Sequence, residues 1–323
     1  MSGADWRFAR DDLERAAAVV YRTLTPTPQF AWPLLAAGLG AEVWVKHENY
    51  TPTGAFKVRG GLVYFHELAA GGARPAGVIS ATRGNHGQSV GFAARRSGIA
   101  ATIVVPHGNS PEKNAAMRAL GVELIEHGAD FQESREHAAR LAAERDLHMI
   151  PAFHPHLVRG VATYALELLT AVPDIATVYV PIGQGSGICG MIAARDALGL
   201  KTEIVGVVSA HAPAYKLSFE ARKHIEHAVT TELADGMACR VPDDAALDII
   251  CRGAARVLAV TDAEVAAAMR LYFSATHSVA EGAGAAPLAA ACQERARNRG
   301  RRIALVLSGG NVDRDMFARV LAP

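Results

Sequence analysis

Short apolar segments alternate with longer helical segments along most of the chain, and this pattern constrains the fold more than any other feature. Four segments are rich in β-branched residues and predict buried strands: 77–81 (GVISA), 101–106 (ATIVVP), 176–183 (ATVYVPIG) and 203–209 (EIVGVVS). Helix-like segments, such as 86–98, lie between them. Strands and helices that alternate in this way are typical of βαβ units and a parallel sheet, so we expect an α/β fold. A length of 323 residues favours about two domains.

Composition and charge exclude several classes of protein. Hydrophobic residues make up 50% of the chain and charged residues 20%, which is ordinary for a globular enzyme. The 33 basic and 32 acidic side chains give a net charge of +1, so nothing favours nucleic acid or an acidic membrane surface as a partner. The four cysteines form no CxxC pair, which argues against a zinc site and a disulfide framework. The N-terminal sequence lacks the apolar core of a signal peptide, and no apolar run is long enough to span a bilayer. We therefore expect a cytoplasmic protein.

Three glycine-rich turns, at 80–89, 181–190 and 307–311, are candidates for a ligand site. Each follows a predicted strand, and we expect each to open a helix. In an open parallel sheet the loops beyond the carboxyl ends of the strands form the ligand crevice, and glycines there let successive backbone N–H groups surround an anion. The turn at 181–190 (PIGQGSGICG) is the best phosphate site, although it is neither a Walker A loop nor a dinucleotide loop. Taken singly, each turn is also consistent with a tight strand–helix connection.

Lys57, within GAFKVRGG at 54–61, is the candidate nucleophile. It lies between a predicted strand at 41–48 and a predicted helix, where the first amide groups of the helix favour a bound anion. The apolar sequence around it predicts a poorly solvated amine, and poor solvation lowers the pKa of an ammonium group. Such a lysine can act as a nucleophile. Taken alone, it is also consistent with an exposed lysine in the first turn of a helix.

Four motifs, GAFKVRGG, GNHGQ, the glycine loop at 183–187 and SGGN, resemble in this order the pyridoxal-phosphate enzymes of fold type II. Within that group the chain is similar to serine/threonine dehydratases and serine racemases, from about Thr25 to Asp313. The resemblance implies two open twisted parallel-sheet domains flanked by helices, with the cofactor between them. We expect a small substrate-binding domain at 76–154 and a large cofactor-binding domain made of 1–75 and 155–323. It also implies a homodimer, and the length predicts no C-terminal regulatory domain.

The resemblance also implies the site residues and the cofactor, pyridoxal 5'-phosphate. Lys57 is expected to hold the cofactor as a Schiff base and, once the substrate has released it, to act as the base at Cα. Phe56 is expected to pack near the cofactor ring, and Asn85 is expected to bind the ring hydroxyl. Glu281 is expected near the ring or the reacting centre, and Ser308 beside the pyridine nitrogen. The expected phosphate cradle consists of Gly183, Gln184, Gly185, Ser186 and Gly187. The loop expected to bind the carboxylate of an amino-acid substrate consists of Thr82, Arg83, Gly84, Asn85 and His86.

Ser308, which is expected beside the pyridine nitrogen, favours one reaction. A serine hydroxyl there need not keep the nitrogen protonated, and a less electron-poor ring stabilises a free carbanion less well. This favours loss of the α-proton while a β-substituent departs. We therefore predict a dehydratase (ammonia-lyase) that converts a β-hydroxy amino acid of the threonine or serine type to a 2-oxo acid and ammonia. An amino-acid racemase and a β-replacement enzyme of the same fold are the alternatives, and the GNHGQ motif argues against β-replacement, whose enzymes typically carry TSGNTG.

Arg83 departs from the small residue that related enzymes usually carry before GNH. An arginine cannot serve as the acid that a racemase needs on the second face of Cα. Its planar guanidinium suits a carboxylate or an aromatic ring, so we expect Arg83 to select a larger or more polar β-substituent, as in 3-hydroxyaspartate or phenylserine. The alternative is that Arg83 faces solvent or a structural carboxylate.

Val208 and Ser209 also depart from the group. Many relatives have divalent-cation ligands at the matching positions, so we predict no divalent metal. A monovalent ion held by backbone carbonyls is left open.

Overall fold

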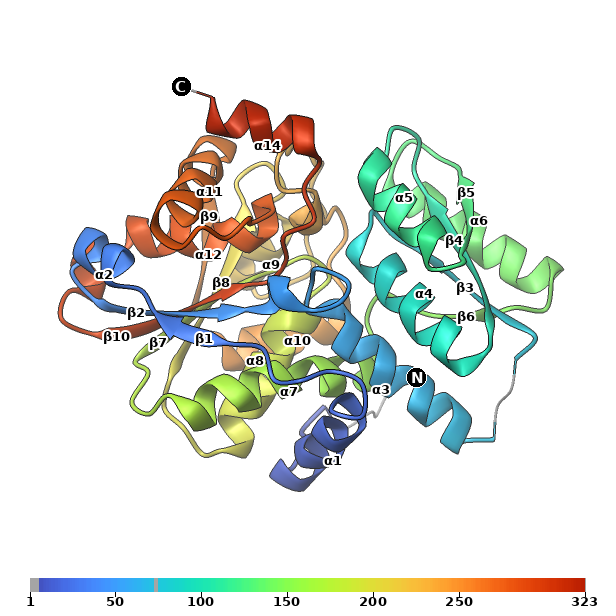
Figure 1. Cartoon of the computed structure of the whole chain (residues 1–323), viewed down its shortest axis with the longest axis horizontal. Helices are drawn as coiled ribbons and strands as arrows, with labels where there is room; N and C mark the ends of the chain where they lie inside the picture. The colour runs from blue at the N-terminus through green and yellow to red at the C-terminus, as the bar shows by residue number, and fades with distance from the viewer. Residues whose placement is uncertain (1–5, 73–74, 323) are drawn as a thin grey trace.

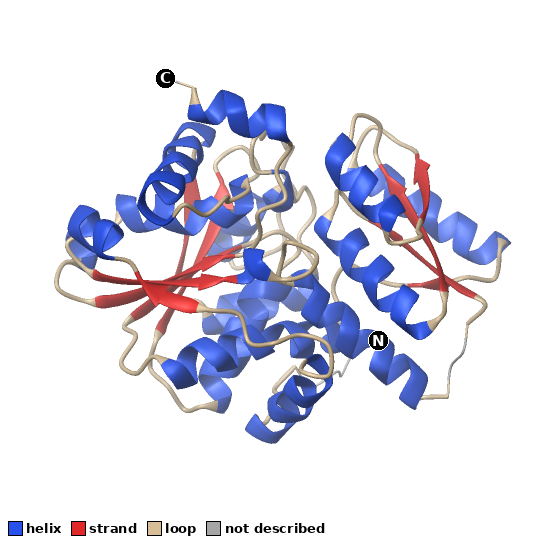
Figure 2. Cartoon of the chain, viewed as in Figure 1, coloured by secondary structure: helices blue, strands red, loops and turns tan. Residues whose placement is uncertain are grey.

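The computed structural model describes residues 6–72 and 75–322. Residues 1–5, 73–74 and 323, which the predicted large domain includes, lie outside the described part. The described chain forms two lobes that lie side by side, each built around its own sheet (Figure 1). Helices cover both faces of each sheet, as the prediction of an α/β fold requires (Figure 2).

The larger sheet has six strands in the order β1-β2-β10-β7-β8-β9. Its strands are β1 (Gln29–Ala31), β2 (Glu42–His47), β7 (Thr177–Pro181), β8 (Glu203–Ser209), β9 (Arg256–Val260) and β10 (Arg302–Leu307). Neighbours from β2 to β9 pair in parallel, as expected. The edge strand β1, which was not predicted, pairs with β2 in the antiparallel sense.

The central strands of the larger sheet are buried on both faces because helices enclose the sheet. Every residue of β7 is buried, which is typical of a parallel sheet between two helical layers. One core contains residues of α7, α8 and α10, and the core on the opposite face contains residues of α2, α11 and α12. The helices of this lobe are α1 (Arg10–Val20), α2 (Pro33–Leu39), α3 (Lys57–Ala70), α7 (Pro155–Ala171), α8 (Ser186–Ala197), α9 (Ala214–Ala221), α10 (Asp244–Gly253), α11 (Asp262–Thr276), α12 (Gly282–Gln293), α13 (Arg295–Asn298) and α14 (Arg314–Leu321).

The smaller sheet has four strands in the order β5-β4-β3-β6, all paired in parallel. Its strands are β3 (Gly77–Ala81), β4 (Ala100–Val105), β5 (Glu123–Glu126) and β6 (His148–Met149), and its helices are α4 (Asn85–Ser97), α5 (Pro111–Ala119) and α6 (Phe131–Glu144). These elements all fall within the predicted small domain. The boundaries at 76 and 154 remain a prediction.

Helix α3 connects the two lobes, and its glycines explain part of the GAFKVRGG motif. A Cβ at Gly60 would come within 2.9 Å of the backbone oxygen of Leu157 in α7. A Cβ at Gly61 would come equally close to the backbone oxygen of Ser89 in α4. Both contacts are too close for a real Cβ, so glycine lets α3 pack directly on a helix of each lobe.

One predicted feature of the C-terminal part was wrong. The turn at 307–311 does not open a helix, because α14 begins only at Arg314. Instead, Gly309 forms an isolated antiparallel bridge with Ala55, which ties this turn to the loop that precedes Lys57.

Candidate active site

The carboxyl ends of β2, β3, β7 and β10 all lead into one cavity. It is lined by every residue that the sequence predicted for the site, namely Phe56, Lys57, Thr82, Arg83, Gly84, Asn85, His86, Gly183, Gln184, Gly185, Ser186, Gly187, Glu281 and Ser308. The ligand crevice of an open α/β sheet lies at this end of the strands. The roles assigned to the individual residues remain predictions.

Lys57 lies at the first position of α3, and its amine points across the cavity to the loop that opens α8. The amine Nζ donates a hydrogen bond to Ser186 Oγ at 3.0 Å and lies 5.2 Å from the centre of the Phe56 ring. Burial lowers the pKa of the Lys57 amine from 10.5 to about 8. At neutral pH a far larger fraction of this amine is therefore unprotonated than of an ordinary lysine.

The loop at 183–186 has the geometry of an anion cup. Gly185 precedes α8 with φ +97°, a conformation that favours glycine, and the first turn of α8 contains no acidic side chain. A Cβ at Gly183 would overlap with the backbone oxygen of Gly236. The backbone N–H groups at the start of α8 are thus left to face an anion, for which the helix dipole is also favourable. The Gln184 side chain donates a hydrogen bond to Cys239 Sγ at 3.4 Å, and both residues line the cavity.

The loop at 82–86 opens α4 on the opposite wall. The Gly84 N–H donates to Thr82 Oγ1 at 2.9 Å, which fixes the turn before the helix. Burial, followed by the charge of Lys57, lowers the pKa of His86 to about 3, so that His86 is neutral. Its Nε2 is buried and has no hydrogen-bond partner among the described residues. The Nε of Arg83 is also buried without a partner in the described part of the chain, and Arg83 lines the cavity.

Asn85 connects the two lobes at the floor of the cavity. Its Nδ2 donates to Glu281 Oε1 at 2.6 Å, and its Oδ1 accepts from Asn311 Nδ2 at 2.9 Å. Burial raises the pKa of the Glu281 carboxyl to about 7, and the nearby charge of Lys113 opposes that rise. Ser308 also lines the cavity, and its backbone oxygen accepts a hydrogen bond from the Phe56 N–H at 3.0 Å. Phe56 and Ser308 therefore hold each other in place beside Lys57.

The sequence analysis missed two charged residues of the cavity, Lys113 and Asp235. Lys113, at the start of α5, pairs with Asp235 Oδ2 at 2.6 Å and lies 3.6 Å from Glu281 Oε2, both on the opposite lobe. Its aliphatic chain covers Gly84, where an added Cβ would come within 2.5 Å of Lys113 Cδ. Lys113 follows strand β4, so the rule that ligands lie beyond carboxyl ends could have indicated it. Asp235 lies in a short 3₁₀ helix (Asp235–Met237) and gave no such signal.

Comparisons with known proteins agree with this geometry. Residues 20–309 match the family described as "Pyridoxal-phosphate dependent enzyme", and the chain belongs to that family. It is 31% identical over 312 residues to an L-threonine ammonia-lyase of Thermotoga maritima, with 96% of this chain and 77% of the relative covered. It is 37% identical over 276 residues to an L-threonine ammonia-lyase of Geobacter sulfurreducens, with coverages of 85% and 68%. The solved structure of threonine deaminase isoform 2 from Solanum lycopersicum superposes with a TM-score of 0.88 at 26% identity, covering 99% of this chain and 95% of that one.

The residues of the cavity fit pyridoxal phosphate. The cup at the start of α8 suits a phosphate, and the Lys57 amine beside it suits an aldehyde. Two of the residues that line the cavity have a buried polar atom without a hydrogen-bond partner among the described residues, His86 at Nε2 and Glu281 at Oε2. By contrast, the described residues contain no group of three or more His, Cys, Asp or Glu that could hold a metal ion. None of the described helices is both long enough and apolar enough to cross a bilayer.

Proposed function

We propose that the protein is a pyridoxal-phosphate-dependent dehydratase (ammonia-lyase) acting on a β-hydroxy amino acid of the threonine or serine type. The observation that carries this proposal is the Lys57 amine, with its lowered pKa, held 3.0 Å from Ser186 Oγ at an anion cup. The activity named for its threonine ammonia-lyase relatives supports it. In the overall reaction the substrate loses water to form an enamine. The enamine tautomerises to an imine, which water hydrolyses to a 2-oxo acid and ammonia.

The residues of the chain account for binding and proton transfer. The backbone N–H groups at the start of α4 bind the substrate carboxylate, because they are free to donate and lie at a helix N-terminus. The Lys57 amine removes the proton from Cα, and its pKa near 8 suits a base that works close to neutral pH. The protonated amine can then supply that proton to the departing β-hydroxyl.

Pyridoxal phosphate, when bound, supplies the electron sink that makes the Cα proton acidic. Phe56 would pack beside its ring, Asn85 would bind the ring hydroxyl and Ser308 would face the pyridine nitrogen. Asn85 has donor capacity for this role, since only one of its two amide N–H groups is needed for Glu281. A racemase requires a long-lived carbanion, and the hydroxyl of Ser308 favours elimination instead.

Arg83 is proposed to select the β-substituent. Arg83 lines the cavity, its Nε is buried without a hydrogen-bond partner, and no carboxylate of the described residues forms an ion pair with it. A guanidinium without a partner favours a substrate that carries an anionic or aromatic β-substituent, such as 3-hydroxyaspartate or phenylserine. Kinetics of Arg83→Ala with serine, threonine, hydroxyaspartate and phenylserine test this. We expect a selective loss for one of the last two, and either a uniform loss or no loss would contradict the selective role.

The release of 2-oxo acid from a panel of β-hydroxy amino acids tests the proposed reaction. We expect stoichiometric 2-oxo acid and ammonia from the wild type and neither product from Lys57→Ala. Inversion at Cα without 2-oxo acid would identify a racemase instead. Product formed only when a second nucleophile is added would identify a β-replacement enzyme.

We further propose a cytoplasmic homodimer. An exposed apolar patch supports the dimer: Phe30, Leu34, Tyr50 and Val279 are 38–63% exposed. His47 connects Phe30 to Tyr50 through ring contacts of 5.7 and 5.2 Å. Light scattering on wild type and Phe30→Asp measures whether this patch forms the interface. The division into domains at 76 and 154 is part of the same proposal.

A further inference from the structure

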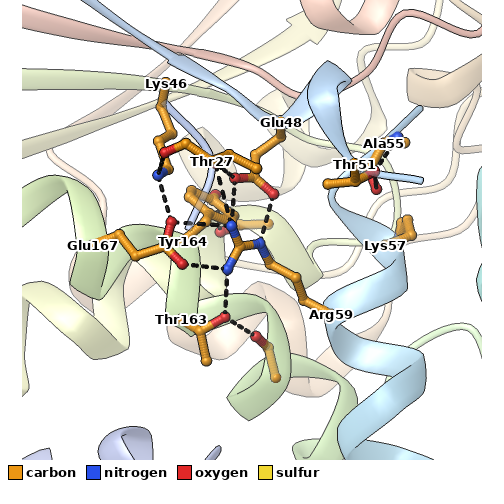
Figure 3. A network of polar contacts seen from close by, with 12 residues as sticks. Thr27, Lys46, Glu48, Thr51, Ala55, Lys57, Arg59, Thr163, Tyr164 and Glu167 are labelled. Carbon is orange, nitrogen blue, oxygen red and sulfur yellow. Dashed lines mark hydrogen bonds and ion pairs between the residues drawn. The ribbon is translucent and has the colours of Figure 1, made fainter. Parts of the chain in front are cut away.

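Four charged side chains form a closed network inside the larger lobe, beside the first turn of α3 (Figure 3). Lys46, Glu48 and Arg59 are fully buried, and the side chain of Glu167 is 7% exposed. They come from the end of β2, the turn that follows it, α3 and α7. The two cations and two anions cancel, so the network is buried without a net charge.

Arg59 is the centre of the network, and all of its N–H groups have acceptors. Its Nε and Nη2 donate to the two oxygens of Glu48 at 2.7 and 3.0 Å. Its Nη1 and Nη2 donate to the two oxygens of Glu167 at 2.6 and 3.0 Å. Thr163 Oγ1 and Thr27 Oγ1 accept further bonds at 3.0 and 3.2 Å. A guanidinium bound on two sides in this planar manner has one orientation only.

The charged state of the network is self-consistent. Burial opposes the charge of Arg59, but Glu48 and Glu167 outweigh it and raise the pKa of the guanidinium. Burial likewise opposes the charge of Glu167, and Arg59 and Lys46 outweigh it and lower the pKa of that carboxyl. Lys46 Nζ also donates to the backbone oxygen of Thr27 at 2.7 Å. Removal of one member would therefore leave a buried charge without its partner.

The network closes the loop that precedes Lys57. Glu48 and Arg59 are 11 positions apart, and their paired hydrogen bonds join the start of this loop to the first turn of α3. Within the loop, Thr51 Oγ1 donates to the backbone oxygen of Ala55 at 2.8 Å and accepts from its N–H at 3.0 Å. Helix positions two apart do not face each other. Accordingly, Arg59 extends from α3 into the network, whereas Lys57 lies outside it (Figure 3).

We infer that Arg59 is a positioning residue, which through Glu48 and Glu167 holds α3 so that the Lys57 amine meets the anion cup. This inference rests on the proposed role of Lys57 as the cofactor-binding lysine. A buried ion pair is a poor source of stability, because the cost of desolvating the charges offsets their attraction. A fixed geometry is what such a network provides, and a reactive amine must be held within about 0.5 Å of its productive position.

The test compares Arg59→Lys with a matched variant at the other end of the sheet. Arg256 also lies between two glutamates, with Nη1 2.8 Å from Glu203 and Nη2 2.5 Å from Glu294. None of these three residues lines the cavity. For the purified holoenzyme of each variant, we would measure the thermal unfolding midpoint, the dissociation constant of pyridoxal phosphate, and the pH at which the visible absorbance of the lysine-bound cofactor changes.

We expect Arg59→Lys to weaken cofactor binding about tenfold or more and to move the pH midpoint, since lysine keeps the charge but loses the planar fork. Arg256→Lys should lower the unfolding midpoint and leave both cofactor measurements unchanged. If Arg59→Lys does not fold, Thr163→Val decides, because it removes only one acceptor of Arg59 and should weaken binding about threefold. Wild-type cofactor binding in the folded Arg59 or Thr163 variant, or equal weakening in Arg256→Lys, would overturn the inference. Visible absorbance that survives in Lys57→Ala would instead refute the proposed function.

Discussion

Replacement of Lys57 by methionine should stabilise the cofactor-free protein. In the folded protein burial lowers the pKa of this amine from 10.5 to about 8. At 1.36 kcal/mol per pKa unit, the gap corresponds to a cost of about 3 kcal/mol for keeping the ammonium charged in the fold. Water in the cavity screens part of that cost, so we expect a gain of about 1–3 kcal/mol in the free energy of unfolding at pH 7. Methionine has a similar length and a good helix propensity, so it should not disturb α3.

The pH dependence gives this prediction its sign. Below pH 8 both states bind the proton, and the folded state bears the full cost. Between pH 8 and 10.5 the unfolded state binds more protons than the folded state, so the stability of the wild type rises with pH. The advantage of Lys57→Met should therefore be largest below pH 8 and vanish above pH 10.5.

Urea unfolding of the cofactor-free proteins at pH 6.5, 8, 9.5 and 10.5 would measure this advantage. Lys201→Met is the control, because Lys201 is exposed and its replacement should change stability by less than about 0.5 kcal/mol. An advantage that stays constant with pH, or a Lys57→Met protein that is less stable than wild type at pH 7, would refute the account of a poorly solvated amine.

Three further predictions concern the cavity. Gly183→Ala should weaken cofactor binding and lower the free energy of unfolding by about 1–3 kcal/mol, because its Cβ would overlap with Gly236. The control Gly38→Ala has free space for its Cβ and should be neutral or stabilising. Titration with pyridoxal phosphate and urea unfolding measure both variants. Lys113→Met should raise the pKa of Glu281 above its value of about 7, because the charge of Lys113 opposes the effect of burial. Carbon-13 NMR of labelled glutamate, with the Glu281 signal assigned by Glu281→Gln, would measure this pKa. An unchanged pKa would contradict the prediction. Removal of pyridoxal phosphate should lower the unfolding midpoint, and a cofactor present at about 100 times its dissociation constant accounts for about 2.7 kcal/mol; an unchanged midpoint would argue against a bound cofactor.

Local signals were sufficient to predict most of the fold and the glycine turns on both walls of the site. Period and residue type indicated the buried strands, and α3 begins at the lysine that the sequence singled out. The turns that open α4 and α8 were recognisable because their glycines serve a local purpose, a tight turn at the end of a strand. These features depend on neighbours in the sequence, which is why the sequence was enough.

Features that depend on distant contacts could not be predicted. The turn at 307–311 has the composition of a helix-opening loop, but its glycines serve a close approach to Ala55 and Glu281. Asp235 becomes a site residue only because Lys113 reaches it from the other lobe. Helices α9 and α10, which were not predicted, contribute buried residues to the core on one face of the larger sheet. Arg59 also gave no sign of its partners, Glu48 and Glu167, which are 11 and 108 positions away.

The attachment of the cofactor to one lysine tests the central claim most directly. The purified protein would be loaded with pyridoxal phosphate, reduced with borohydride, digested and analysed by mass spectrometry. The account predicts a single phosphopyridoxyl-modified peptide that contains Lys57. Modification of another lysine, such as Lys113, or no specific modification at all, would contradict it.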